Sequence, residues 1–120
     1  MANAEQFALL KTGVASWNKW RNLNVGVLPD LSQASLKKAT LGMVQLTAAN
    51  LSGTNLTNAV LRHANLRKAI LAEANLTGSD LAEANFVGAD LSVCIHVFDL
   101  GHNLGCTVRT KYLEVETADF

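Results

Sequence analysis

The sequence predicts an all-β solenoid, a coil of short extended sides stacked on itself, with an N-terminal α-helical cap. Leucines recur every five residues from Leu31 to Leu91, a small residue stands two places before nearly all of them, and an amphipathic helical pattern precedes the series. We expect one domain with three segments. A capping helix and linker form residues 1–28, the repeat coil forms 29–93, and an irregular C-terminal cap or degraded last coil forms 94–120.

The first segment has the pattern of an amphipathic helix over residues 3–22. Its apolar residues alternate at spacings of three and four, which places them on one face of a helix: Phe7, Leu10, Val14 and Trp17. Asn3 can cap the first turn together with Gln6, three residues further on. The apolar face must cover something, and we expect it to close the open end of the coil.

The second segment has a strict period of five. Its predicted inward residues are Leu31, Leu36, Leu41, Leu46, Leu51, Leu56, Leu61, Leu66, Leu71, Leu76, Leu81, Phe86 and Leu91. Five residues rotate an α-helix by about 140° and reverse the face of a flat strand, so neither regular element can bury this series. A chain that turns once in each repeat can bury all of them.

Each repeat then has an inward pair and three outward residues. The small residue and the leucine lie two apart and point the same way, as in a strand, while the two residues after the leucine form the turn. Burying each leucine contributes roughly 1.5–3 kcal/mol before conformational entropy is subtracted, so the leucine column is the main stabilising feature.

Several repeats share one sequence pattern: Ala49-Asn50-Leu51-Ser52-Gly53, Ala64-Asn65-Leu66-Arg67-Lys68 and Ala74-Asn75-Leu76-Thr77-Gly78. They resemble the A(D/N)LXX motif of the pentapeptide-repeat family. Residues 9–21 also resemble the N-terminal segment of some bacterial members, so the chain looks most like small bacterial or cyanobacterial members with an N-terminal helix. The resemblance implies a right-handed quadrilateral β-helix with four repeats per coil. It also implies a family in which most members lack an assigned activity.

The bulk composition excludes a global electrostatic role. Ten basic side chains balance ten acidic ones, so no overall field attracts nucleic acid or an anionic membrane. No apolar run is long enough to cross a membrane, and charged or polar residues interrupt every apolar run near the N-terminus: Glu5, Lys11, Asn18 and Lys19. We therefore expect a soluble, cytoplasmic protein without a signal peptide.

The C-terminal segment contains one candidate metal site: Cys94, His96, His102 and Cys106. Zinc favours thiolate and imidazole ligands, but this spacing departs from the usual structural zinc patterns. The alternative is that the thiols pack within a cap and the histidines lie at its surface. No other cofactor is expected.

Outward basic residues form the candidate interaction surface. Arg62, Arg67 and Lys68 should lie on neighbouring sides of one coil, where they could hold an acidic partner protein or a phosphate. The alternative is ordinary solvated charge. The asparagines and aspartates before the inward residues suit hydrogen bonding to local backbone, so we do not interpret their carboxylates as catalytic.

The sequence therefore favours a non-catalytic scaffold or protein-interaction module that binds another protein. Mimicry of DNA toward an enzyme such as a topoisomerase is a second hypothesis, which the zero net charge and short coil disfavour. An enzyme built on the Cys/His cluster is the third and weakest. A homodimer could form through apolar residues of the C-terminal cap: Phe98, Leu100, Leu104 and Phe120.

Overall fold

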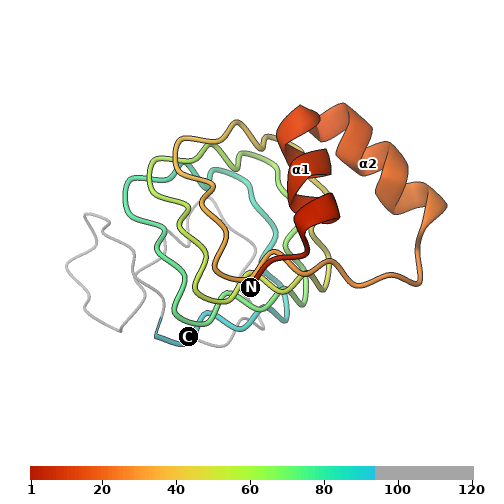
Figure 1. Ribbon diagram of the computed structural model, residues 1–120. Coiled ribbons are helices and arrows are strands. Elements are labelled where there is room, and N and C mark those ends of the chain that lie inside the picture. The colour runs from red at the N-terminus through yellow and green to blue at the C-terminus, as the bar shows by residue number, and fades with distance from the viewer. Residues whose placement is uncertain (94–120) are drawn as a thin grey trace.

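The structure is a computed structural model that describes residues 1–93. It shows two helices followed by a stack of similar coils (Figure 1). The predicted C-terminal cap, the Cys/His cluster and the dimer residues all lie outside the described residues.

The N-terminal cap consists of two helices, so the prediction of a single helix over residues 3–22 is wrong. α1 spans Ala4–Thr12 and α2 spans Val14–Leu23. Gly13 separates them with φ 135° and ψ 158°, a conformation that essentially only glycine adopts and that interrupts helical hydrogen bonding. The three-and-four spacing of apolar residues continues across this break, which is why the pattern suggested one helix.

The two helices still present one apolar surface to the coil. Leu10 and Trp17 are buried, and Phe7 and Val14 are partly buried against the same core. The side chain of Asn3 caps α1 by accepting from the backbone nitrogens of Glu5 and Gln6. The predicted reciprocal bond from Gln6 to Asn3 does not form, because the Gln6 Oε1 instead accepts the backbone N–H of Asp30 at 2.7 Å.

The coil has a register of twenty residues. Parallel bridges join residues twenty apart, from Asp30 with Asn50 to Ile70 with Asp90. A shift of twenty residues is four repeats of five, so each coil has four sides. Within residues 1–93 every bridge is an isolated one, because two of every five residues are taken up by a turn.

Each turn follows the inward leucine. The Leu31 carbonyl accepts from the Ala34 backbone nitrogen at 3.2 Å, and Gln33 between them has φ 59°. The second turn residue keeps a positive φ in every repeat, although most of these residues are not glycine. Each such residue costs about 1–2 kcal/mol in a left-handed conformation, so the stacked coils must impose it.

The core is the column of inward residues. All of the predicted leucines and Phe86 have at most 3% of their surface exposed. Thr54 and Ser79 replace alanine at inward positions, and their hydroxyls donate to the carbonyls of Leu31 and Leu76. The buried hydroxyls are therefore satisfied, as their burial requires.

Most bridging positions hold asparagine or aspartate for a local reason. The Asn50 Oδ1 accepts from the Ser52 backbone nitrogen at 3.0 Å, and the same bond recurs in other repeats, as from Val87 to Asn85. This Asx turn fixes the start of the outward loop. The carboxylates and amides at these positions thus have a structural role.

Candidate interaction surfaces

The turn residues of successive coils lie one above another at the corners of the stack. Two adjacent turn residues project from each corner, and the same corner recurs twenty residues later. Since the backbone at each corner is held by bonds to neighbouring coils, its side chains start from fixed positions. A partner would therefore meet a preformed pattern of side chains.

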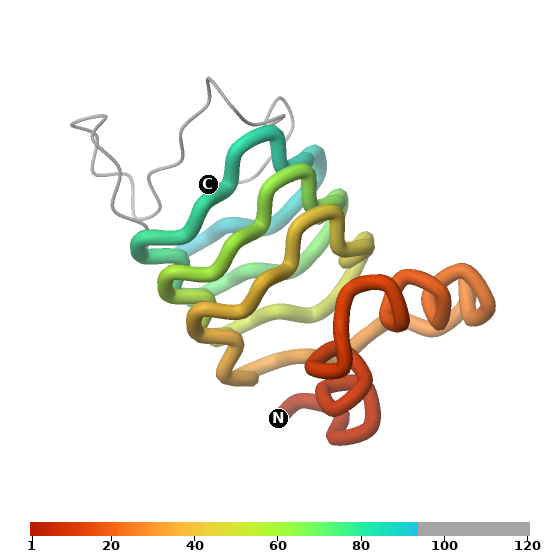
Figure 2. The backbone as a smooth tube through the Cα atoms, turned by 90° about the horizontal axis from the view of Figure 1, so that it is seen from above, coloured from red at the N-terminus to blue at the C-terminus, as the bar shows by residue number. Residues whose placement is uncertain are grey.

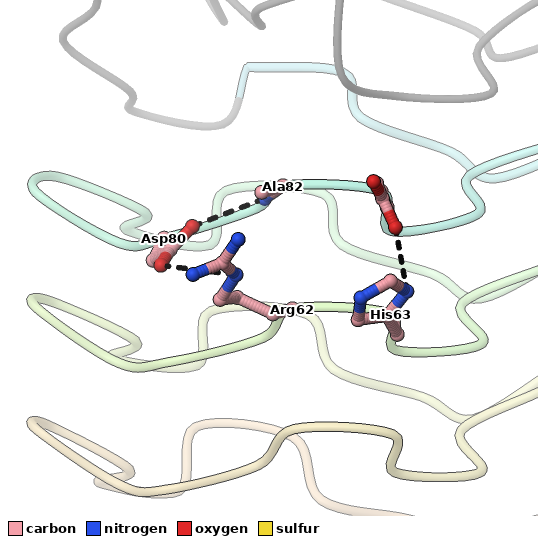
Figure 3. Close-up of polar contacts among 5 residues, drawn as sticks. Arg62, His63, Asp80 and Ala82 are labelled. Atoms are coloured by element: carbon pink, nitrogen blue, oxygen red, sulfur yellow. Dashed lines mark hydrogen bonds and ion pairs between the residues drawn. The ribbon is translucent and has the colours of Figure 1, made fainter.

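One corner is occupied by ion pairs between consecutive coils (Figure 3). The Arg62 Nε lies 3.7 Å from Asp80 Oδ2, and the His63 Nδ1 lies 2.9 Å from Glu83 Oε2. About half of each side chain remains exposed, so each pair contributes little to stability. The pairing matters more for recognition than for stability. The exposed Arg62 lies beside the Asp80 carboxylate and therefore attracts an anion less strongly than an unpaired arginine would.

The next corner of the same coil carries two cations, Arg67 and Lys68, that have no acidic partner in the described part of the chain. Both side chains are exposed. The Arg67 backbone nitrogen donates to Asn65 Oδ1, which fixes this turn. A Cβ placed on Gly88 would lie 3.3 Å from the Lys68 Cγ, so the glycine of the following coil makes room for the lysine stem.

The three predicted interaction residues therefore differ in whether they have an acidic neighbour. All of them lie on adjoining corners of one coil, but Arg62 has an acidic partner, whereas Arg67 and Lys68 do not within residues 1–93. The other basic turn, Lys37 and Lys38, lies one coil earlier at a different corner.

The cap contains polar contacts that sequence reasoning missed. The Trp17 Nε1 donates to the Gln45 carbonyl at 2.9 Å, and Asn18 both accepts from the Gln45 nitrogen and donates to the Met43 carbonyl. The Arg21 guanidinium donates to the Thr47 carbonyl at 2.7 Å, and burial lowers the pKa of that side chain. These bonds span 25 to 28 residues, so no local pattern marks them.

A depression of about 270 Å³ lies on the cap. Its lining residues are Asn3, Glu5, Gln6, Leu9 and Trp20. Glu5 is its single ionisable side chain, so the depression offers no acid and base pair for catalysis.

The predicted metal ligands Cys94, His96, His102 and Cys106 lie outside the described residues. Among residues 1–93 no group of three or more His, Cys, Asp or Glu side chains could hold a metal ion. In the same part of the chain, no helix has the length and apolar character needed to cross a membrane.

The stacked four-sided coils, with turn residues aligned at each corner, define a solenoid repeat protein. A family model of pentapeptide repeats, in eight copies, matches residues 30–53, 43–71 and 60–95. The chain belongs to the pentapeptide-repeat family. No curated protein shows significant sequence similarity to it.

Solved structures of pentapeptide repeat proteins are similar to this chain. The protein alr5209 from Nostoc PCC 7120 is 27% identical with a TM-score of 0.58, over 84% of this chain and 72% of that one. A protein from the Arabidopsis thaliana thylakoid lumen is 28% identical with a TM-score of 0.50, over 54% of this chain and 48% of that one.

A third similar structure is HetL from Nostoc sp. strain PCC 7120, described as involved in the regulation of heterocyst differentiation. It is 28% identical with a TM-score of 0.47, over 75% of this chain and 48% of that one. The chain thus spans about half the length of HetL and of the Arabidopsis protein.

Proposed function

We propose that this protein is a non-catalytic interaction module, a right-handed four-sided scaffold that binds an acidic surface of another protein through Arg67 and Lys68. The observation that carries the proposal is the contrast between adjacent corners. Arg62 and His63 face Asp80 and Glu83, whereas the Arg67 and Lys68 charges have no acidic partner among residues 1–93.

The rigidity of the corner supports binding. Arg67 follows the Asx bond of Asn65, and the backbone of Lys68 donates to the Val87 carbonyl of the next coil at 3.0 Å. A partner would have to order only the two side chains and not the backbone, so less entropy is lost on binding. Exposed cations on such a corner also favour encounter with acidic surfaces.

The alternatives have less support. Mimicry of DNA needs a continuous acidic face, but here Asp80 and Glu83 lie beside Arg62 and His63 on one corner. A metal-dependent activity would depend on the Cys94 to Cys106 segment, because residues 1–93 contain no group of three or more His, Cys, Asp or Glu side chains that could hold a metal ion. We propose a cytoplasmic location as part of the same interpretation.

The test is affinity capture from cells of the native host with three forms of the protein. The Arg67→Glu, Lys68→Glu variant reverses the two charges of the proposed binding corner. The Lys11→Glu, Lys19→Glu variant reverses two exposed charges on the helices and serves as the control. We expect a discrete acidic protein to be retained by the wild type and the control but lost by the corner variant. Equal capture by all three forms would contradict the proposed surface.

A further inference from the structure

Neighbouring coils are joined by a repeated set of backbone hydrogen bonds. In the second coil, the Asn55 nitrogen donates to the Ala34 carbonyl at 2.9 Å and the Asn55 carbonyl accepts from Leu36 at 2.7 Å. The carbonyl of the first turn residue also takes part, since Thr57 accepts from Lys38. Each side of a coil therefore presents one donor and two acceptors toward the coil before it.

The first coil has no preceding coil, and the cap replaces it on two of the four sides. On one side Asp30 donates to Gln6 and accepts from the Asn3 nitrogen at 2.8 Å. On the other side Gln45 donates to Asn18 and accepts from the Trp17 indole. Figure 2 shows α1 and α2 gathered on one side of this end of the stack.

On the remaining two sides, the hydrogen-bonding groups that face away from the second coil have no partner among residues 1–93. Neither the N–H nor the carbonyl of Ser35 and Thr40 has a hydrogen bond among the described residues. The carbonyls of Lys37 and Gly42 are likewise without a donor within residues 1–93. We call the backbone from Ser35 to Gly42 the open edge.

The open edge requires no apolar partner. The inward residues beside it are already covered, since Leu36 and Leu41 have 3% and 2% of their surface exposed. The cap thus covers the leucines of the first coil and leaves Ala39 partly exposed, and it provides hydrogen-bond partners for the bridging residue on only two sides. Free N–H and carbonyl groups at a sheet edge are the feature that binds a peptide by adding it as a further strand, and here they lie on two sides that meet at the turn of Lys37 and Lys38.

The charge of the edge selects an acidic occupant. Lys37 and Lys38 are both exposed, lie between Ser35 and Thr40, and form no ion pair within the described part of the chain. A second copy placed edge to edge would bring these lysines against their own counterparts, which disfavours self-association through this edge.

We propose that the open edge binds an acidic segment of a partner protein by β-strand addition, the segment bending once beside Lys37 and Lys38 as the coil does. Ser35 and Thr40 supply the main-chain hydrogen bonds, and Lys37 and Lys38 select carboxylates on the outward residues of the added segment. This inference rests on the proposed binding function and gives it a second contact, at a site distinct from Arg67 and Lys68.

The test uses the full chain and a fluorescein-labelled synthetic octapeptide in which glutamate and threonine alternate. We expect binding in fluorescence anisotropy, weakened at least tenfold by methylation of alternate backbone nitrogens of the peptide. The Lys37→Glu, Lys38→Glu variant should also bind at least tenfold more weakly. The Lys11→Glu, Lys19→Glu variant reverses two exposed charges on the helices and should bind the peptide as the wild type does.

Amide hydrogen exchange provides a readout at the edge itself. Saturating peptide should slow exchange of the Ser35 and Thr40 amides at least tenfold and leave those of Asp30 and Gln45 unchanged. Equal binding of the methylated peptide would overturn strand addition, as would equal weakening by both charge variants or the absence of binding. Dimerisation through these amides without peptide, seen by sedimentation, would overturn the acidic partner. None of these outcomes depends on the capture experiment with the Arg67 and Lys68 variant, so the two proposals can fail separately.

Discussion

The Trp17 indole nitrogen donates to the Gln45 carbonyl at 2.9 Å, and in the following coil the Asn65 carbonyl accepts from the Leu46 backbone nitrogen at 2.8 Å. The two bonds are equivalent, because Gln45 and Asn65 occupy the same side of consecutive coils. A side chain of α2 therefore supplies the donor that a preceding coil would have supplied.

Replacing Trp17 with phenylalanine should remove this donor and keep an aromatic ring. The Gln45 carbonyl would then be left without its partner, and we expect the free energy of unfolding to fall by about 1–3 kcal/mol. Urea unfolding followed by far-UV circular dichroism measures the change. Trp20→Phe is the control, because the Trp20 indole nitrogen makes no hydrogen bond among the described residues and the ring is only partly buried. An equal loss in both variants would show that the hydrogen bond is unimportant.

Gly13→Ala should destabilise the cap. Alanine favours a helix, so a continuous helix over residues 3–22 would be stabilised by the substitution. In the structure Gly13 has φ 135°, and a Cβ placed on it would have no atom within 4 Å, so the cost is conformational and should be about 1–3 kcal/mol. Urea unfolding decides between the two, since a gain in stability would mean that the helix continues through residue 13.

The repeat region could be predicted from the sequence because its geometry is local. The inward pair, the turn and the Asx bond all lie within five residues, so Ala49 to Gly53 already contains the structure of one side. The break at Gly13 could not be predicted from periodicity, since the spacing of Leu10, Val14 and Trp17 suits one helix or two.

The candidate surfaces were only partly predictable for a related reason. Outward placement of Arg62, Arg67 and Lys68 follows from the repeat, but the pairing of Arg62 with Asp80 depends on which residues meet across coils. The open edge depends on where the helices dock. The contacts that decide it, from Gln6 to Asp30 and from Asn18 to Gln45, join residues 24 and 27 apart.

Ala48→Gly should be neutral or stabilise the protein by up to about 1.5 kcal/mol. Ala48 has φ 59°, so glycine removes a left-handed strain of about 1–2 kcal/mol and loses about 0.4–1 kcal/mol through a more flexible unfolded chain. Ala72→Gly is the same change at the first turn position, where φ is not positive, and should destabilise by about 0.5–1 kcal/mol. Thermal and urea unfolding of both variants test the contrast, and an equal loss in both would contradict it.

Asp30 and Asp90 should make stability depend on pH in the acid range. Hydrogen bonds from the Ser32 hydroxyl and backbone nitrogen hold the pKa of Asp30 below its ordinary value, and Ser92 does the same to the pKa of Asp90. A lowered folded pKa favours the ionised form in the folded state. This contribution is therefore complete above the unfolded pKa of about 3.9 and is lost as the pH falls through the folded values.

The Asp30→Asn, Asp90→Asn variant tests this contribution, because Asn50 already makes the same two bonds with Ser52 without a titrating group. We expect the variant to fold and to be slightly less stable than the wild type at pH 7. The difference should shrink as the pH falls from about 5 to about 2, since protonation removes the advantage of the wild-type carboxylates while the remaining acidic groups titrate alike in both proteins. Urea midpoints at several pH values measure it, and a difference that stays constant or grows toward low pH would show that the serine bonds do not favour the ionised form.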